Sequence, residues 1–125
     1  MRILLDTHIL LWWFYERERL TSTALEIVRD AEAVFFSSAT MWEIAIKVRL
    51  GKLRADPQEL AEGLHRYDFL ELPVLTRHAL IVARLPMHHN DPFDRLLVSQ
   101  AMSEPLHLVT ADPRLRQYSD LVIQV

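Results

Sequence analysis

Short apolar runs alternate with longer segments of helical pattern along this chain, and few folds accommodate that order of elements. The runs occupy residues 2–5, 33–36, 69–72, 106–109 and 121–125. Each run is too short for a stable helix and lies between polar or turn-forming residues, which is typical of a strand buried on both faces. Strands that alternate with helices predict a parallel sheet with helices on both faces, an α/β/α sandwich.

Local signals place helices between these strands. Asp56 and Asp91 each combine a capping side chain with a following proline, which suits the first position of a helix. Thr7 and Thr76 are expected to cap two further helices, and Gly51 occupies the position that follows a helix. The expected helices span residues 7–15, 20–31, 39–50, 57–67, 76–85 and 92–103.

The 125-residue chain is expected to form one domain, residues 1–125, and its composition excludes several classes of protein. With 0 Cys it has no disulfides, zinc ribbons, iron–sulfur clusters or cysteine nucleophiles. Its only glycines, Gly51 and Gly63, exclude the glycine-rich loops that bind phosphates. The longest nearly apolar run, residues 9–15, is far shorter than the ~20 residues that span a bilayer. Without a recognisable signal peptide, we expect a cytoplasmic protein that contacts no membrane.

The charge balance limits how the chain can bind nucleic acid. Lys plus Arg number 14 and Asp plus Glu 17, which gives a formal net charge of −3. Any such contact therefore requires a local basic patch. The best candidate is a set of cations that no acid interrupts: Lys47, Arg49, Lys52 and Arg54. The same residues fit equally well a basic helix C-terminus favoured by the helix dipole.

Four carboxylates flank the predicted strands. Asp6 ends the first strand, and Asp112 follows the fourth. Glu43 and Asp94 lie in the first turns of the helices that follow the second strand and precede the fourth. Ligands of such sheets bind beyond the carboxyl ends of the strands, so all four acids are expected at one crevice. Each acid taken alone also fits a structural role, as a helix cap, a capping-box residue or part of a turn.

The convergence of these acids requires a neutralising charge. Two carboxylates ~5 Å apart repel by roughly 3 kcal/mol at an effective dielectric constant of about 20. Mg²⁺ or Mn²⁺ suits an open site of oxygen ligands better than Zn²⁺ does. Such ions activate a water molecule and stabilise the leaving oxygen during phosphodiester hydrolysis. The acids therefore predict a metal-dependent phosphodiesterase.

Four segments stand out by their order and spacing: Leu4-Leu5-Asp6-Thr7-His8, Trp42-Glu43-Ile44, His89-Asn90-Asp91-Pro92-Phe93-Asp94-Arg95-Leu96-Leu97 and Leu108-Val109-Thr110-Ala111-Asp112. Together they cover nearly the whole chain and resemble the successive motifs of PIN-domain ribonucleases. Within that family they are most similar to the VapC-like toxins of bacterial toxin–antitoxin modules. No single segment is decisive, but the ordered set is specific.

The resemblance implies roles for particular residues. Thr110 and Thr7 would support the site, and Asp91 either supports it as well or only caps its helix. The residues that would bind Mg²⁺ or Mn²⁺ and carry the catalysis are Asp6, Glu43, Asp94 and Asp112. The resemblance further implies an endoribonuclease that cuts tRNA or another structured RNA, a homodimer, and a small DNA-binding antitoxin that blocks the site.

Other residues near these motifs are candidates for substrate binding. His8, just after the first strand, either contacts phosphate or packs locally. His88 and His89 are interpreted as part of a surface loop that touches substrate rather than as metal ligands, since no further ligand follows at a helical spacing. Arg95, next to Asp94, is expected to neutralise the acids or to hold a phosphate.

The first predicted helix is apolar nearly all round, through Leu10 to Tyr15. One side is expected to face the sheet. The remaining residues are expected to contact a second copy of the chain or the antitoxin, with Trp13 as the residue that tests this hypothesis.

Three other functions compete with the nuclease. A signalling receiver domain shares the length and an acidic Mg²⁺ pocket, but residues 69–73 contain no phosphoacceptor Asp, and the only lysines are Lys47 and Lys52. A catalytically inactive, binding-only domain is the second alternative, against which stands the presence of all four acids. Hydrolysis of small phosphate esters is the third, and the acids alone do not exclude it.

Overall fold

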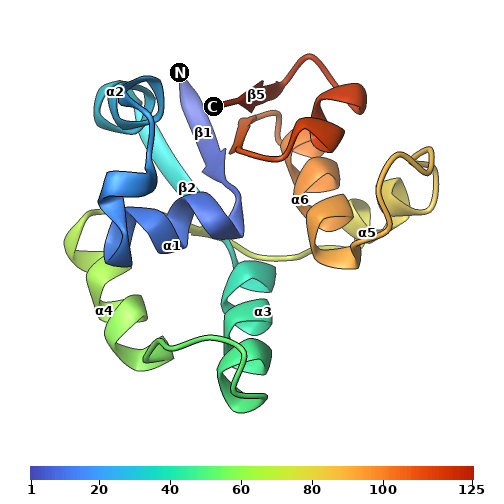
Figure 1. Cartoon of the computed structure of the whole chain (residues 1–125). Helices are drawn as coiled ribbons and strands as arrows, with labels where there is room; N and C mark the ends of the chain where they lie inside the picture. The colour runs from blue at the N-terminus through green and yellow to red at the C-terminus, as the bar shows by residue number, and fades with distance from the viewer.

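A sheet of five strands lies at the centre of the protein, and all neighbouring strands are parallel (Figure 1). The computed structural model describes residues 1–125. The strands are β1 (Arg2–Leu5), β2 (Ala33–Ser37), β3 (Leu70–Leu72), β4 (His107–Thr110) and β5 (Val122–Gln124). With helices packed on both faces, the predicted α/β/α fold is confirmed.

Six α-helices connect or follow the strands, close to the predicted ranges. They are α1 (Thr7–Tyr15), α2 (Ser22–Asp30), α3 (Ser38–Arg49), α4 (Pro57–Arg66), α5 (Thr76–Val82) and α6 (Pro92–Ser103). Two 3₁₀ segments, η1 (Arg17–Arg19) and η2 (Pro113–Gln117), complete the structure. The sequence did not predict η2, because Asp112-Pro113 is equally typical of a simple turn.

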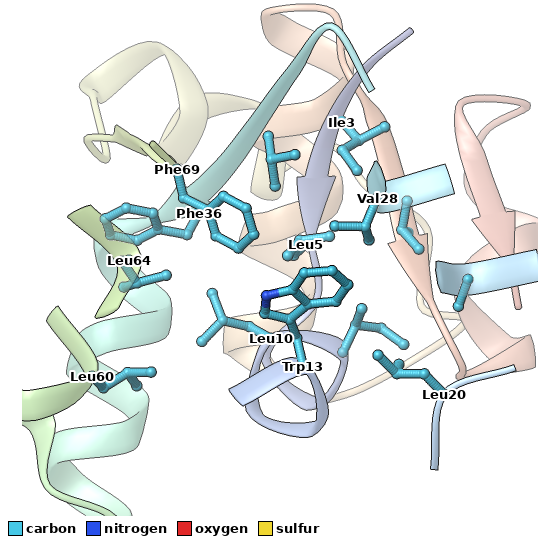
Figure 2. Packing of buried hydrophobic residues seen from close by; sticks show 14 of the residues in the cluster. Ile3, Leu5, Leu10, Trp13, Leu20, Val28, Phe36, Leu60, Leu64 and Phe69 are labelled. Carbon is cyan, nitrogen blue, oxygen red and sulfur yellow. The ribbon is translucent and has the colours of Figure 1, made fainter. Parts of the chain in front are cut away.

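The two faces of the sheet carry separate hydrophobic cores. Ile3 and Leu5 of β1 belong to the larger core and Leu4 to the smaller, and all three are fully buried. This alternation is that of a strand covered on both faces. The larger core takes side chains from α1, α2 and α4 (Figure 2), whereas the smaller one takes them mainly from α6. Trp13 is only 5% exposed within the larger core, so the prediction that it contacts a partner is wrong.

Two helix starts differ from the prediction. The N-cap position of α1 belongs to Asp6, and Thr7 is already its first helical residue. The N-cap position of α5 belongs to Leu75, whose N–H donates to His78 Nδ1 over 3.0 Å. A buried imidazole thus accepts the N–H of the N-cap residue, and the hydroxyl of Thr76 does not have the expected capping position. The same helix ends at Val82, three residues earlier than predicted.

Helices α1 and α4 approach each other closely at Gly63. A Cβ atom at this position would lie 2.8 Å from the ring of Phe14, so any side chain would force that ring or the two helices to shift. The same ring packs edge-on against Tyr67 and Phe69, with centroid distances of 5.5 and 6.1 Å. The glycine therefore lets the aromatic part of the larger core close.

The strand order locates the functional crevice. In the order β3-β2-β1-β4-β5, the chain first adds β2 and β3 on one side of β1. It then adds β4 and β5 on the other side of β1. The crevice of such a sheet lies where this reversal occurs, beyond the carboxyl ends of β1 and β4. A receiver domain has the order 2-1-3-4-5, so the receiver alternative is excluded by topology.

None of the helices combines the length and the hydrophobicity that crossing a lipid bilayer requires. The longest, α3 and α6, have 12 residues each.

Candidate active site

Asp6 is the most deeply buried carboxylate at the crevice. It follows β1 directly and is 3% exposed. Its Oδ2 accepts a hydrogen bond from the hydroxyl of Thr110, the last residue of β4. Its Oδ1 is buried and has no hydrogen-bond partner. Because an unsatisfied buried acceptor costs about 1–3 kcal/mol, this oxygen indicates a place for a ligand rather than a structural role.

Asp94 is held in the first turn of α6 by two neighbouring residues. Asp91 caps the helix: its Oδ1 accepts the N–H groups of Phe93 and Asp94, over 2.8 and 3.1 Å. On the other side, Nε2 of His89 lies 2.8 Å from Oδ2 of Asp94. The capping role suggested for Asp91 is therefore present. Since Asp91 also lines the acidic pocket, it supports the site by fixing the start of α6.

Burial and mutual repulsion alter the acidity of these two carboxyl groups. The pKa of Asp94 is raised from 3.8 to about 6, first by its burial and then by the charge of Asp6. Burial also raises the pKa of Asp6, although the hydrogen bond from Thr110 acts in the opposite direction. A bound cation would stabilise the charged form of both acids, so raised pKa values of neighbouring acids are typical of sites that bind a positive charge.

Asp112 completes the acidic edge from the segment after β4. It caps η2 by accepting the N–H of Arg114 over 2.9 Å. The guanidinium of Arg114 also donates to both carboxylate oxygens, over 3.1 and 2.8 Å. This pairing holds the pKa of Asp112 below its usual value. His89 Nε2 lies 3.7 Å from Oδ2 of Asp112, so the imidazole stands between this acid and Asp94.

Glu43, the fourth predicted acid, lies beside this group on α3. It is 4% exposed on α3, and both its oxygens have partners. Oε1 accepts the hydroxyl of Thr7 over 2.8 Å, and Oε2 accepts Lys47 Nζ over 2.7 Å. The hydroxyl of Thr7 also lies 3.1 Å from that of Thr40. Glu43 therefore ties α3 to the start of α1, next to Asp6, and does not line the acidic pocket.

An open pocket brings the remaining acids together. Its volume is about 430 Å³. The charged and imidazole side chains that line it are Asp6, His8, Arg19, His89, Asp91, Asp94, Asp112 and Arg114. Ligand atoms of His89, Asp94 and Asp112 lie within 4.8 Å of one another. Three of the four predicted acids thus share one pocket, and the fourth lies behind it.

His89 is the functional residue that the sequence interpretation misjudged. It is not merely part of an exposed loop, because its side chain is only 9% exposed and contacts two acids. Its backbone N–H donates to the Tyr118 hydroxyl over 2.9 Å, which fixes the loop. The sequence offers one local indication that His89 contacts Asp94: it lies five residues before Asp94, at the entry to a capped helix. The contact with Tyr118, 29 residues away, has no local signal.

Arg95 does not have the predicted role. It is 9% exposed, and its guanidinium is turned away from the acids. It donates to the carbonyl oxygens of Pro86, Val82 and Leu85 over 2.8, 3.0 and 3.2 Å. These carbonyls belong to the end of α5 and the segment after it, so Arg95 anchors that segment and cannot hold a substrate phosphate.

The predicted basic patch divides into two parts. Lys47, Lys52 and Arg54 line a groove adjacent to the acidic pocket, whereas Arg49 is exposed outside it. Lys47 is paired with Glu43, and this hydrogen bond raises its pKa. His8 is exposed and lines both the groove and the acidic pocket.

The donor set suits a hard divalent cation. The unpartnered Oδ1 of Asp6 and the carboxylates of Asp94 and Asp112 are the oxygen ligands that Mg²⁺ and Mn²⁺ prefer. Zn²⁺ would favour more nitrogen or sulfur ligands, and His89 is the only imidazole of the pocket that lies within 4 Å of the acids. A cation would also remove the repulsion that raises the pKa of Asp94.

Comparison with known proteins agrees with this architecture. The family model described as PIN domain matches residues 3–121. Ribonuclease VapC22 from Mycobacterium tuberculosis is 30% identical over 122 residues, which is 93% of this chain and 91% of that one. The protein therefore belongs to the PIN-domain family.

Solved structures share the fold at lower sequence identity. VapBC2 from Rickettsia felis, bound to a DNA fragment from its promoter, matches with a TM-score of 0.71 and 14% identity, over 100% of this chain and 98% of that one. FitAcB from Neisseria gonorrhoeae matches with a TM-score of 0.67 and 18% identity, over 98% and 96% of the two chains. The arrangement of strands and helices is thus that of the family.

Proposed function

We propose that this protein is an endoribonuclease that hydrolyses RNA phosphodiesters with the aid of Mg²⁺ or Mn²⁺, and that it is the toxin of a toxin–antitoxin module. The observation that carries the proposal is the buried, unpartnered Oδ1 of Asp6 in a pocket shared with Asp94 and Asp112. Membership of the PIN-domain family and the likeness to Ribonuclease VapC22 support it.

The residues of the pocket have distinct roles in this proposal. Asp6, Asp94 and Asp112 would hold the cation, and Thr110 orients the Asp6 carboxylate by hydrogen bonding. A bound divalent cation lowers the pKa of a coordinated water and stabilises charge on the phosphate. His89 fixes the orientation of Asp94. Glu43 is a positioning residue, because it connects α3 to Thr7 and so fixes the helix start that follows Asp6.

The cationic side chains at the rim complete the chemistry. Arg19 and Arg114 line the pocket together with His8. A substrate phosphate brings negative charge into an acidic pocket, so nearby guanidinium groups are needed to lower its electrostatic cost. Arg114, which pairs with Asp112 in the structure, would exchange part of that pairing for a phosphate oxygen.

Cleavage of RNA tests the proposed activity. The purified protein, free of any antitoxin, is incubated with total tRNA and with a structured RNA in Mg²⁺, in Mn²⁺ and in EDTA. We expect discrete products that require the cation and disappear in Asp94→Asn. Cleavage that persists in EDTA, or a fully active Asp94→Asn variant, would contradict the mechanism. Turnover of small phosphate esters without cleavage of any RNA would instead support the third alternative function.

The proposed partners are a small DNA-binding antitoxin and a second copy of the chain. The likeness to chains of the VapBC2 and FitAcB structures supports the antitoxin.

An exposed tryptophan marks the proposed dimer surface. Trp42 is 64% exposed and packs edge-on against Phe93 at a centroid distance of 5.5 Å, and an exposed tryptophan is typical of an interface. Light scattering should give the mass of a dimer for the wild type and of a monomer for Trp42→Glu. Equal masses would reject this surface.

A further inference from the structure

A second groove continues from the acidic pocket. It lies between α1 and the segment that follows α3, and its volume is about 240 Å³. Its cationic side chains come from three separate segments: Arg19, Lys47, Lys52 and Arg54. Trp12 and Tyr15 of α1 contribute aromatic surface, and Tyr15 is 44% exposed.

The groove and the acidic pocket adjoin each other. His8, Trp12 and Arg19 line both of them. From His8 to Tyr15, α1 advances about 10 Å at 1.5 Å per residue. This length corresponds to roughly three stacked nucleotides of one strand. A strand whose phosphate lies at the acids would therefore extend directly into the groove.

Arg19 stands at the boundary between the two, and the structure holds it there. Its guanidinium stacks over the Trp12 ring at 4.7 Å from the centroid. One of its nitrogens, NH1, donates to Glu16 over 2.9 Å. A guanidinium fixed in this way loses little side-chain entropy on binding and keeps other N–H groups free for a phosphate oxygen.

The remaining charges of the groove favour a polyanion. Lys52 and Arg54 are exposed and form no ion pair. Lys47 neutralises Glu43, which lies behind the groove. The only acid that lines the groove is Glu16, and Arg19 already pairs with it. Uncompensated cations beside an exposed aromatic ring, here Tyr15, are typical of surfaces that bind single-stranded nucleic acid.

We propose that this groove binds the single-stranded RNA segment that flanks the cleaved phosphodiester, and that Arg19 contacts the phosphate next to it. The inference rests on the proposed ribonuclease function and specifies how that site receives its substrate. A single strand fits better than a duplex, because the exposed ring of Tyr15 can stack only on an unpaired base. The cationic lining and the position beside the acidic pocket favour RNA over a protein segment as the occupant.

Binding of a fluorescently labelled, single-stranded RNA oligonucleotide in EDTA tests the groove without catalysis. The variants are Arg19→Gln and the double variant Lys52→Gln/Arg54→Gln. Arg49→Gln is the matched control, since it removes the same charge from the same basic stretch outside the groove. We expect Arg19→Gln to weaken binding roughly 5- to 10-fold and to reduce the salt-dependence slope by about 0.7, as for one lost phosphate contact. Arg49→Gln should bind as the wild type does.

Cleavage kinetics give a second, independent readout. Arg19→Gln and the double variant should raise KM, with a smaller change in kcat, and Arg19→Lys should recover part of the loss. Equal weakening by Arg49→Gln, or wild-type binding by the groove variants, would overturn the proposal. So would groove variants that keep RNA binding but escape inhibition by the antitoxin, because a protein would then occupy the groove. Failure of the wild type to cleave RNA would count against the proposed function, whereas cleavage unchanged in Arg19→Gln would count against the groove alone.

Discussion

A histidine–carboxylate pair lies at each end of helix α6, and the two pairs differ in burial and in the pKa of the carboxyl group. Near its C-terminus, His78 Nε2 lies 2.7 Å from Glu104. Near its N-terminus, His89 Nε2 lies 2.8 Å from Asp94. The Glu104 carboxylate also accepts Arg77 over 2.6 Å, and these partners hold its pKa below the usual value. Asp94 has the opposite shift, with a pKa raised to about 6.

The surroundings of each pair explain the difference. His78 is fully buried, and its Nδ1 accepts the Leu75 N–H, so its Nε2–H donates to Glu104. Every polar atom of that ring has a partner. Burial and the Asp6 carboxylate, by contrast, both disfavour the ionised form of Asp94. The partial positive charge of the α6 N-terminus does not offset these two effects. A satisfied pair stabilises the fold, whereas an unsatisfied group of acids lowers stability and retains the capacity to bind a ligand.

The largest expected effect distinguishes the acidic site from the His78–Glu104 pair by activity. Asp6→Asn should slow RNA cleavage by more than about 100-fold, because a lost ligand weakens the site more than a lost supporting residue does. The same variant should unfold at equal or higher urea concentration than the wild type, since it removes a buried, repelled charge. Glu104→Gln is the matched control and should keep its cleavage rate. A loss of activity in both variants would show that the two regions do not differ as described.

The next effect distinguishes the two histidines by stability. His78→Ala should lower the free energy of unfolding by about 3 kcal/mol, because it leaves a cavity and removes partners of Leu75 and Glu104. His89→Ala should lower it by only about 1 kcal/mol, since its acids remain accessible to water. Urea denaturation measures both values. A greater destabilisation by His89→Ala would reverse the comparison.

The two carboxylates should also respond to pH in opposite directions. For Asp94 the native pKa of about 6 exceeds the ordinary aspartate value of 3.8, so its contribution favours folding at low pH and is lost as pH rises through 6. For Glu104 the native pKa is lowered, so its contribution is present above 4.5 and is lost as pH falls below that value. The metal-free wild type should therefore gain on the order of 1 kcal/mol relative to Asp94→Asn between pH 7 and 5.

The corresponding control is Glu104→Gln, which should keep the wild-type response between pH 7 and 5 and differ from it only below about 4.5. Thermal unfolding in EDTA across this range provides the measurement. Parallel curves for Asp94→Asn and the wild type between pH 7 and 5 would mean that Asp94 carries no unfavourable charge.

The smallest expected effect concerns the exposed member of the satisfied region. Arg77→Gln removes an ion pair whose cationic side chain is 56% exposed, so the free energy of unfolding should fall by only about 0.5 kcal/mol. A loss comparable to that of His78→Ala would show that the surface ion pair, and not the buried imidazole, holds α5 against α6.

The sequence predicted the strands and the acidic edge because both depend on local pattern. A buried parallel strand is a continuous apolar run, and the acids at its end follow it directly, as Asp6 follows β1. Asp91 also has an unambiguous local signal, a capping side chain before a proline. Such features require no knowledge of the rest of the chain.

The side-chain contacts that the sequence did not predict depend on distant segments. Arg95 lies next to a site acid in sequence, but its helix position turns it toward the carbonyls after α5. His89 is placed by Tyr118, and Glu43 is engaged by Thr7, 36 residues away. Neighbouring residues on a helix point in different directions, so adjacency in sequence is a weak guide to which side chains share a pocket.

Calorimetric titration of Mn²⁺ into the metal-free protein tests most directly whether the unsatisfied acids form a metal site. We expect binding by the wild type and by Glu104→Gln, and none by Asp6→Asn or Asp94→Asn. Mn²⁺ should also raise the unfolding temperature of the wild type, and it should leave the unfolding temperatures of Asp6→Asn and Asp94→Asn unchanged. Equal Mn²⁺ binding by the wild type and Asp6→Asn would contradict the assignment of the unpartnered carboxylate as a ligand.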